Sequence, residues 1–214
     1  PLAYLAFSCL TGAHASSAPD CEWIVSGGGD KSDKARGVAF DRQGNAFLAA
    51  ETTGDSTFGT LKHRSAGSMD CVLIKLDTEG RPLWLRSIGG SAIDRAYAVA
   101  CDDQGNAYVT GHFESTDAVA DNIKLPNAGS YDLFVAKYSP EGRLLWIRTG
   151  GGPGYDYGHA ITVDRKGHIL VSGSLAAGGR LGDRTSVPEG SPSAVFCAKY
   201  DGEGALLWAK TTTG

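Results

Sequence analysis

The sequence DLFVAKYSPEGRLLW, residues 132–146, occurs three times in this chain with limited variation. The other copies are DCVLIKLDTEGRPLW at 70–84 and AVFCAKYDGEGALLW at 194–208, and CEWIVSGGG at 21–29 resembles the end of a fourth. The tryptophans Trp23, Trp84, Trp146 and Trp208 are 61, 62 and 62 residues apart. A fixed period of this kind indicates a repeat architecture.

Each repeat divides into four short apolar runs, here called a, b, c and d. All are of strand length, rich in β-branched or aromatic residues, and bounded by Gly, Asp or Asn. Run a occupies 35–41, 96–102 and 158–164; run b 45–51, 106–112 and 168–174; run c 71–76, 133–138 and 195–200; run d 82–88, 144–150 and 206–212. The runs predict antiparallel four-stranded units at about 35–88, 96–150 and 158–212, with essentially no helix after residue 22.

The turns between the runs predict which ends of the strands lie together. Glycines recur at one position of each short turn: Gly44, Gly105 and Gly167 between a and b, and Gly80, Gly142 and Gly204 between c and d. Such a glycine supplies the positive φ that a tight hairpin needs. Both hairpins are therefore expected at one end of the unit, and the long b–c and glycine-rich d–a connections at the other.

The placement of large and small side chains predicts how the units pack. Run c is apolar on both faces, as Leu133 and Phe134 illustrate, so a sheet must be stacked between neighbours. Run a has small residues on one face, which suits an innermost strand where sheets converge. Radial stacking of four-stranded sheets is a β-propeller, so we predict an all-β fold of propeller blades.

The number of repeats predicts an incomplete ring. Three full units of about 62 residues and one extra d-like strand at 22–27 are present, whereas propellers typically close with four to eight blades. A lone outer strand at the start would complete the last blade of a closed ring. We therefore expect a fragment of a larger propeller whose remaining blades are missing from this chain, with an assembly of fragments as the alternative.

The pattern W-x9-D-x7-D-x2-GN, followed by D-x-F-V-A-K and G-x-L-x-W, resembles the SBBP family, the bacterial beta-propeller repeat, over about residues 22–214. The resemblance implies propeller blades in secreted or surface-exposed bacterial proteins. It implies no settled activity and no catalytic residues. Two positions depart from the pattern: Ala50 stands where the other repeats have Gly111 and Gly173, and Ala194 replaces Asp70 and Asp132.

The composition excludes some classes of partner. Of 214 residues, 42% are hydrophobic and 21% charged, and the net charge is -4. No basic patch or charge run occurs, so nucleic acid is not expected as a partner. No stretch reaches about 18 apolar residues, so no membrane-spanning helix is expected.

The first residues differ in kind from the repeats. The apolar stretch 2–10 and the small residues after it fit the remnant of a secretory signal peptide at 1–15, followed by a linker at 16–21. An N-terminal strand is the alternative. A signal peptide would make the protein secreted, periplasmic or bound to the cell surface.

Two positions at the start of run a vary between repeats, while turn and packing residues recur. Lys34, Arg95 and Tyr157 occupy the first position, and Arg36, Tyr97 and His159 the second. Both should open on the long-loop end near the axis, where loops of all blades converge. We predict these six as ligand-binding residues that offer cations, aromatic planes and an imidazole to a protein or glycan. An ordinary solvated rim is the alternative.

The other polar residues give weaker signals. The recurring acids Asp33, Asp94 and Asp156, and Asp41, Asp102 and Asp164, are interpreted as turn formers, with a Ca²⁺ site as the alternative. No cofactor is otherwise predicted. No histidine pair, GxSxG or P-loop occurs, so no metal-binding or catalytic residue is predicted. Cys71, Cys101 and Cys197 replace core hydrophobes and are expected to be packing thiols.

A weaker likeness connects the AKYSPEGRLLW run with the tryptophan-docking repeats of quinoprotein dehydrogenases. The vicinal disulfide and calcium site of those proteins are not visible here, so the tryptophans are interpreted as core. We expect a secreted or cell-surface binding or scaffold module without catalysis of its own. The alternative is a propeller enzyme, either an extracellular polymer lyase or hydrolase or a quinoprotein-like oxidoreductase. A carboxylate or histidine cluster on one loop face would favour the enzyme.

Overall fold

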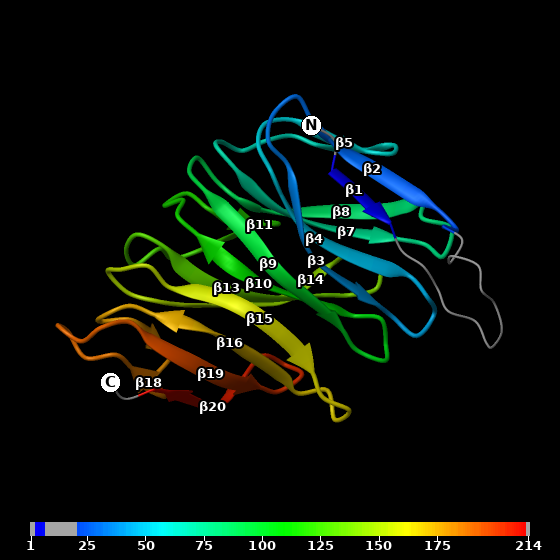
Figure 1. Cartoon of the computed structure of the whole chain (residues 1–214). Coiled ribbons are helices and arrows are strands. Elements are labelled where there is room, and N and C mark those ends of the chain that lie inside the picture. The colour runs from blue at the N-terminus through cyan, green and yellow to red at the C-terminus, as the bar shows by residue number, and fades with distance from the viewer. Residues whose placement is uncertain (1–2, 7–20, 213–214) are drawn as a thin grey trace, which may run out of the picture.

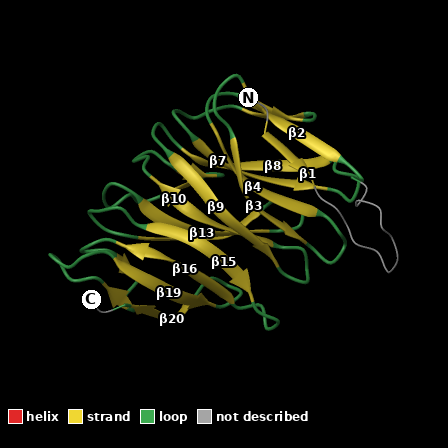
Figure 2. Ribbon diagram, viewed as in Figure 1, coloured by secondary structure: helices red, strands yellow, loops and turns green. Residues whose placement is uncertain are grey.

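The computed structural model describes residues 3–6 and 21–212. Within these residues every regular element is a β-strand and no helix occurs (Figure 2). The three antiparallel sheets that contain the repeats follow one another along the chain and stack as an open fan (Figure 1). The prediction of all-β propeller blades is confirmed.

Each blade contains four strands in the spatial order a, b, c, d, which is also their order in the sequence. Blade 1 comprises β3 (Lys34–Phe40), β4 (Ala46–Thr52), β7 (Asp70–Leu76) and β8 (Pro82–Gly89). Blade 2 comprises β9 (Asp94–Cys101), β10 (Ala107–Phe113), β13 (Asp132–Tyr138) and β14 (Leu144–Gly150). Blade 3 comprises β15 (Tyr157–Val163), β16 (Ile169–Leu175), β19 (Ala194–Tyr200) and β20 (Leu206–Thr211). The departures at Ala50 and Ala194 interrupt neither β4 nor β19.

Short hairpins in the b–c loops extend the outer edge of the preceding sheet. In blade 1 the loop forms β5 (Ser56–Phe58) and β6 (Leu61–His63), and in blade 2 it forms β11 (Val119–Ala120) and β12 (Ile123–Lys124). β11 pairs with β8, so the first sheet has six strands. In blade 3, β17 (Arg180–Leu181) and β18 (Thr185–Ser186) lie next to the end of β14 through a bridge from Gly151 to Arg180.

The extra N-terminal strand is β2 (Ile24–Gly29), and it joins none of the three blades. β2 pairs with β5, just as β8 pairs with β11, so it occupies the place of the outer strand of a preceding blade. Residues Ala3–Ala6 form β1, which pairs antiparallel with β2. The rest of the predicted signal peptide and nearly all of the predicted linker lie outside the described residues.

The tryptophans join each blade to the next. The indole Nε1 of Trp84 donates to the carbonyl oxygen of Pro140 at 2.9 Å, and that of Trp146 to Gly202 at 3.0 Å. Both side chains are buried, with 8% and 7% exposed, whereas Trp208 on the uncovered face of blade 3 is 38% exposed. The interpretation of the tryptophans as core is confirmed for Trp84 and Trp146.

The glycine of the c–d turn makes this contact possible. Gly142 has φ +80, and a Cβ atom there would lie 2.8 Å from the Trp84 ring. The position therefore needs glycine both for its backbone conformation and for the close approach of the indole.

The inner strands bring the blades closest together. A Cβ atom on Gly37 of β3 would lie 3.1 Å from the Cα of Ala98 in β9. The small residues of run a thus allow adjacent inner strands to approach, as the sequence predicts. Large residues of runs b, c and d fill the space between the sheets, with Phe47, Leu73 and Phe134 in one continuous core between blades 1 and 2.

Cys71 and Cys101 of the repeats pack in a core, and the cysteines in the described residues are free. Cys71 is buried in the core between blades 1 and 2, and burial raises the pKa of its thiol well above the usual value. Burial likewise raises the pKa of the Cys101 thiol to about 12. Both thiols are protonated at neutral pH, which suits packing rather than chemistry.

Candidate functional site

A β-bulge at the start of each inner strand places three of the predicted site residues. In the a–b pairing of blade 1, Ala35 faces Ala50 and Gly37 faces Ala49, which leaves Arg36 without a cross-strand partner. The same shift leaves Tyr97 unpaired in blade 2 and His159 unpaired in blade 3. A bulge of this kind re-aims a side chain and is common beside functional sites.

The three bulge residues form a row across the blades. The Arg36 guanidinium carbon lies 5.9 Å from the centre of the Tyr97 ring. The Tyr97 ring in turn lies 5.3 Å from the His159 ring and 6.4 Å from Tyr157, and His159 stacks on Tyr157 at 5.3 Å. These distances are in the range of cation–π and aromatic pair contacts. Residues distant in sequence thus meet on one continuous surface.

A buried carboxylate forms ion pairs with the three cationic side chains of this surface. Glu51, at the end of β4, has no exposed side-chain area and accepts hydrogen bonds from Arg36 Nε at 3.2 Å and Nη2 at 2.8 Å. Arg95 Nε lies 3.4 Å and Lys34 Nζ 3.7 Å from its oxygens. The hydrogen bond with Glu51 raises the pKa of Arg36. Three cations surround one carboxylate, so the group carries excess positive charge.

A buried histidine occupies the position in blade 2 that Glu51 occupies in blade 1. His112 stacks on Tyr131 with ring centres 4.4 Å apart and meets Tyr157 edge-on at 5.2 Å. Its side chain is fully buried, and neither ring nitrogen has a hydrogen-bond partner. Burial, with Arg95 and His159 nearby, lowers the pKa of His112 to about 3. The imidazole is therefore neutral at physiological pH.

All six predicted residues come together with three that the sequence reasoning missed. We call the group the inner-edge cluster: Lys34, Arg36, Glu51, Arg95, Tyr97, His112, Tyr131, Tyr157 and His159. Glu51 and His112 end otherwise apolar strands at equivalent positions, where blade 3 has Ser174. That recurring polar position is the signal that could have identified them.

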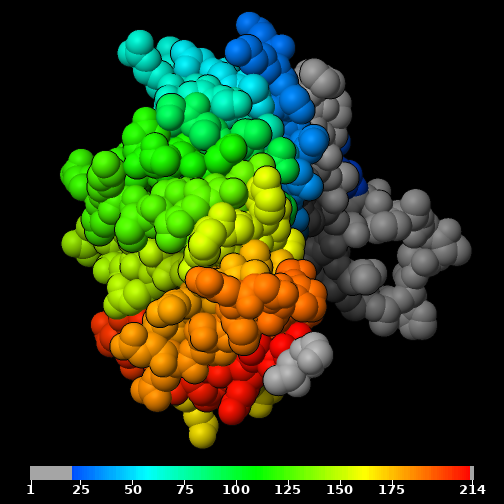
Figure 3. Space-filling model, turned by 90° about the vertical axis from the view of Figure 1, so that its left-hand side faces the viewer, coloured from blue at the N-terminus to red at the C-terminus, as the bar shows by residue number. Residues whose placement is uncertain are grey.

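The cluster lies where β3, β9 and β15 begin and where β4 and β10 end, which is the end of the blades with the long loops. Figure 3 shows this end of the molecule. Tyr155, 56% exposed, meets Tyr131 edge-on at 4.9 Å and extends the aromatic surface outward. The b–c hairpins share this end, but they pair with the outer strand of the preceding blade and so lie away from the inner edge. The hairpin strands therefore lie apart from the inner-edge residues, although Tyr131 brings the end of the blade 2 b–c connection into the cluster.

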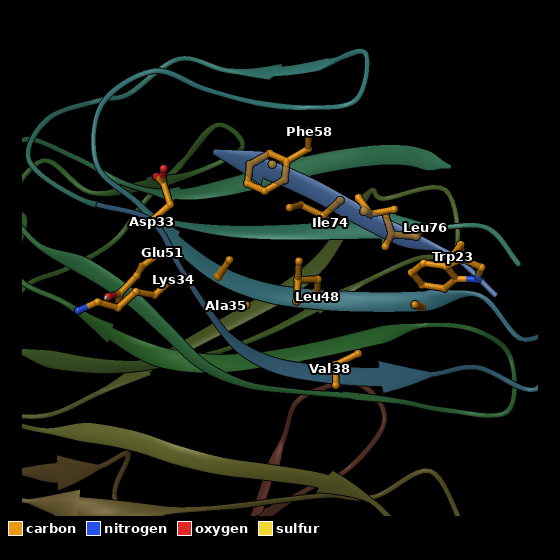
Figure 4. A pocket seen from close by; sticks show the side chains of 14 residues that line it. Trp23, Asp33, Lys34, Ala35, Val38, Leu48, Glu51, Phe58, Ile74 and Leu76 are labelled. Carbon is orange, nitrogen blue, oxygen red and sulfur yellow. Dashed lines mark ion pairs between the residues drawn. The ribbon is translucent and has the colours of Figure 1, made fainter. Parts of the chain in front are cut away.

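An apolar pocket lies between β2 and blade 1 and adjoins the cluster. Trp23, Leu48, Phe58 and Ile74 line it, among others. In Figure 4, Lys34 and Glu51 lie together at one end of this pocket and Trp23 at the other. The pocket is an apolar seam between packed sheets, and its polar end belongs to the inner-edge cluster.

The hairpin end is built differently. Asp41 Oδ1 accepts the backbone N–H groups of Gln43 at 3.0 Å and Asn45 at 2.9 Å, and Asp102 and Asp164 repeat this arrangement. These acids are turn formers, as the sequence predicts. Among the described residues, no group of three or more His, Cys, Asp or Glu side chains could hold a metal ion. The Ca²⁺ site stays a prediction. No helix of the described chain is long and apolar enough to cross a membrane.

Asp132, at the start of β13, is a buried acid whose ionisation opposes folding. One oxygen accepts the backbone N–H of Ala128, while Oδ1 is buried without a partner. Burial, with Asp156 nearby, raises the pKa of Asp132 to about 6. The folded state thus holds a proton that the unfolded state releases near pH 4. Stability due to this group is present at low pH and is lost as the pH rises through 6.

We expect Asp132→Asn to flatten the pH dependence of stability between pH 4 and 7. The wild type should lose about 2–3 kcal/mol of unfolding free energy over this window from Asp132, because one pKa unit corresponds to about 1.4 kcal/mol. Denaturant unfolding at several pH values measures this. Asp117→Asn is the control, since hydrogen bonds from Ser91 lower the pKa of that exposed acid. An unchanged slope in Asp132→Asn would contradict the assignment.

The comparison with protein families agrees with the repeat. Residues 27–56 match the SBBP family, described as a beta-propeller repeat. An uncharacterized WD repeat-containing protein of Acanthamoeba polyphaga mimivirus is 27% identical over 170 residues, which cover 70% of this chain and 12% of that protein. A crystal structure of a protein of unknown function from Bacteroides caccae aligns over 91% of this chain and 86% of its own, with 12% identity and a TM-score of 0.32. The predicted resemblance to SBBP is thus confirmed for the segment from β2 to β5.

Proposed function

We propose that this chain, which carries the SBBP beta-propeller repeat, is a binding and scaffold module that holds its ligand on the inner-edge cluster. The bulge in all three inner strands carries the proposal. It presents Arg36, Tyr97 and His159 at equivalent positions, with a different chemistry in each blade. A repeat conserves what builds the blade, so a position that is structurally constant and chemically varied suits recognition. A secreted, periplasmic or cell-surface location belongs to the same proposal.

The arrangement supports binding better than catalysis. Glu51 is enclosed by cations, and the lowered pKa of His112 keeps that imidazole neutral and buried. His159 is the exposed imidazole of the cluster, and its contacts with Tyr97 and Tyr157 are ring contacts rather than hydrogen bonds. Catalysis by a nucleophile and base needs such groups within hydrogen-bond reach of each other. The enzyme alternative therefore has less support, although both histidines and Glu51 lie on one face.

An array of purified neutral and acidic polysaccharides and of acidic and basic peptides tests this proposal. We expect Lys34→Ala/His159→Ala to weaken binding of the recognised probe at least about tenfold, or about 1.4 kcal/mol, because both side chains are exposed contact groups. The control is Arg165→Ala/Lys166→Ala in the exposed hairpin of blade 3, which should bind like the wild type. Absence of binding to every probe, or loss of binding in the control alone, would contradict the proposal.

A further inference from the structure

The charge of the inner-edge cluster is opposite to that of the whole chain. The cluster combines Lys34, Arg36 and Arg95 with one carboxylate, whereas the chain has a net charge of -4. The contacts of Arg95 with Glu51 and Met69 are made by its Nε. Its two terminal nitrogens make no hydrogen bond among the described residues. A guanidinium with two free terminal nitrogens can bind a carboxylate in a bidentate manner. The local chemistry therefore favours an anionic ligand.

Aromatic surface lies directly beside these cations. Tyr97 is half-buried beneath Arg36, His159 is exposed and stacked on Tyr157, and Tyr155 is 56% exposed at the rim. Aromatic faces of this kind offer large, rigid contact area at little conformational cost. They suit the C–H faces of sugar rings, which a simple inorganic anion lacks. The ligand should therefore combine negative charge with rings.

The contacts also extend over successive blades. The row from Arg36 through Tyr97 to His159 uses one residue from each blade, with 5.9 Å and 5.3 Å between neighbours. A linear ligand can meet all three, whereas a small ligand would use one or two. His112 adds a second observation, because it is fully buried under the row with both ring nitrogens unpartnered. A buried polar group without a partner calls for an explanation, and a ligand that orders the row above His112 would supply one.

We infer that the ligand is an acidic polysaccharide with uronate residues, whose carboxylates meet Arg95 and Arg36 and whose sugar rings lie on Tyr155 and His159. This inference rests on the proposed function, since it names the ligand of the same cluster. It assigns separate roles to two kinds of side chain. The arginines bind the carboxylates, and the aromatic rings pack against the sugar rings. Exposed charge contacts weaken with salt, so binding should also fall as ionic strength rises.

The test measures binding of four polymers by calorimetry: polygalacturonate, its methyl ester, dextran sulfate and neutral dextran. We expect polygalacturonate to bind at least about tenfold more tightly than its methyl ester, because esterification removes the charge and leaves the rings. Arg95→Gln should remove this difference, and Tyr155→Ala should weaken both polymers. Lys166→Ala is the control, and thermal unfolding verifies that each variant is folded.

The other outcomes separate the inference from the proposed function. Equal binding of polygalacturonate and its methyl ester, or of dextran at the same cluster, would overturn the uronate inference while the cluster stays the binding site. Equally tight binding of dextran sulfate would show a general polyanion site and would also overturn it. So would binding confined to acidic peptides on the array. Binding of polygalacturonate that no cluster variant weakens would overturn the inference and the proposed function together.

Discussion

Trp146→Ala should destabilise the protein by about 3–5 kcal/mol, the usual cost of replacing a large buried aromatic side chain by alanine. The indole is 7% exposed, packs beside Tyr108 and closes on the glycine of the next c–d turn, Gly204. Its removal leaves a cavity between blades 2 and 3 and takes away the hydrogen bond to the carbonyl of Gly202. Denaturant unfolding of the purified variant measures the change in free energy.

Trp208→Ala is the matched control for this experiment. It occupies the same repeat position, but its side chain is 38% exposed because no further described blade covers it. We expect this replacement to cost less than half as much as Trp146→Ala. A loss under about 1 kcal/mol in Trp146→Ala would show that the tryptophan is not part of an inter-blade core.

Glu51→Leu should destabilise blade 1 by up to about 3 kcal/mol. The substitution keeps side-chain volume but leaves Arg36 and Arg95 facing each other without their common counter-charge. Removing one partner of a buried ion pair is costly, and the cost is moderated here because the arginine side chains are 31% and 30% exposed to water. Thermal and denaturant unfolding give the free energy.

Glu51→Gln separates charge from hydrogen bonding at this position. The amide oxygen can still accept from Arg36, so this variant should lose less stability than Glu51→Leu. Both variants should also weaken ligand binding, since Glu51 orients the guanidinium groups of the inner-edge cluster. Wild-type stability together with wild-type binding in Glu51→Leu would mean that the carboxylate does not organise the cluster.

The blades could be predicted from the sequence because their determinants are local and repeated. The turn glycines, the tryptophans and the alternation of small and large residues predict strand order and packing, and all three blades follow them. The bulge could not be predicted, because it is a one-residue shift in pairing between β-strands that no residue type requires. Arg36, Tyr97 and His159 were therefore identified by their variation, without the backbone feature that presents them.

The other residues of the site could not be predicted from the sequence, because their roles depend on contacts between blades. Glu51 looks like the polar end of a strand until Arg95 of the next blade is placed beside it. His112 can likewise be assigned to the cluster only from its ring contacts with Tyr131 and Tyr157, which are distant in sequence. The b–c loops lie at the predicted end of the blades. Their pairing with the outer strand of the preceding blade could be recognised only from the three-dimensional structure.

The most direct test of the central claim is an NMR experiment in which a ligand is added to the protein. The imidazole resonances of two histidines at opposite ends of the molecule are followed. His159 belongs to the inner-edge cluster, while His168 lies in the hairpin turn, where it contacts Asp164 at 3.0 Å. With polygalacturonate as the probe, the imidazole resonances of His159 should shift and broaden, while those of His168 should stay unchanged. Shifts confined to His168 would place the binding site on the hairpin end and contradict the account.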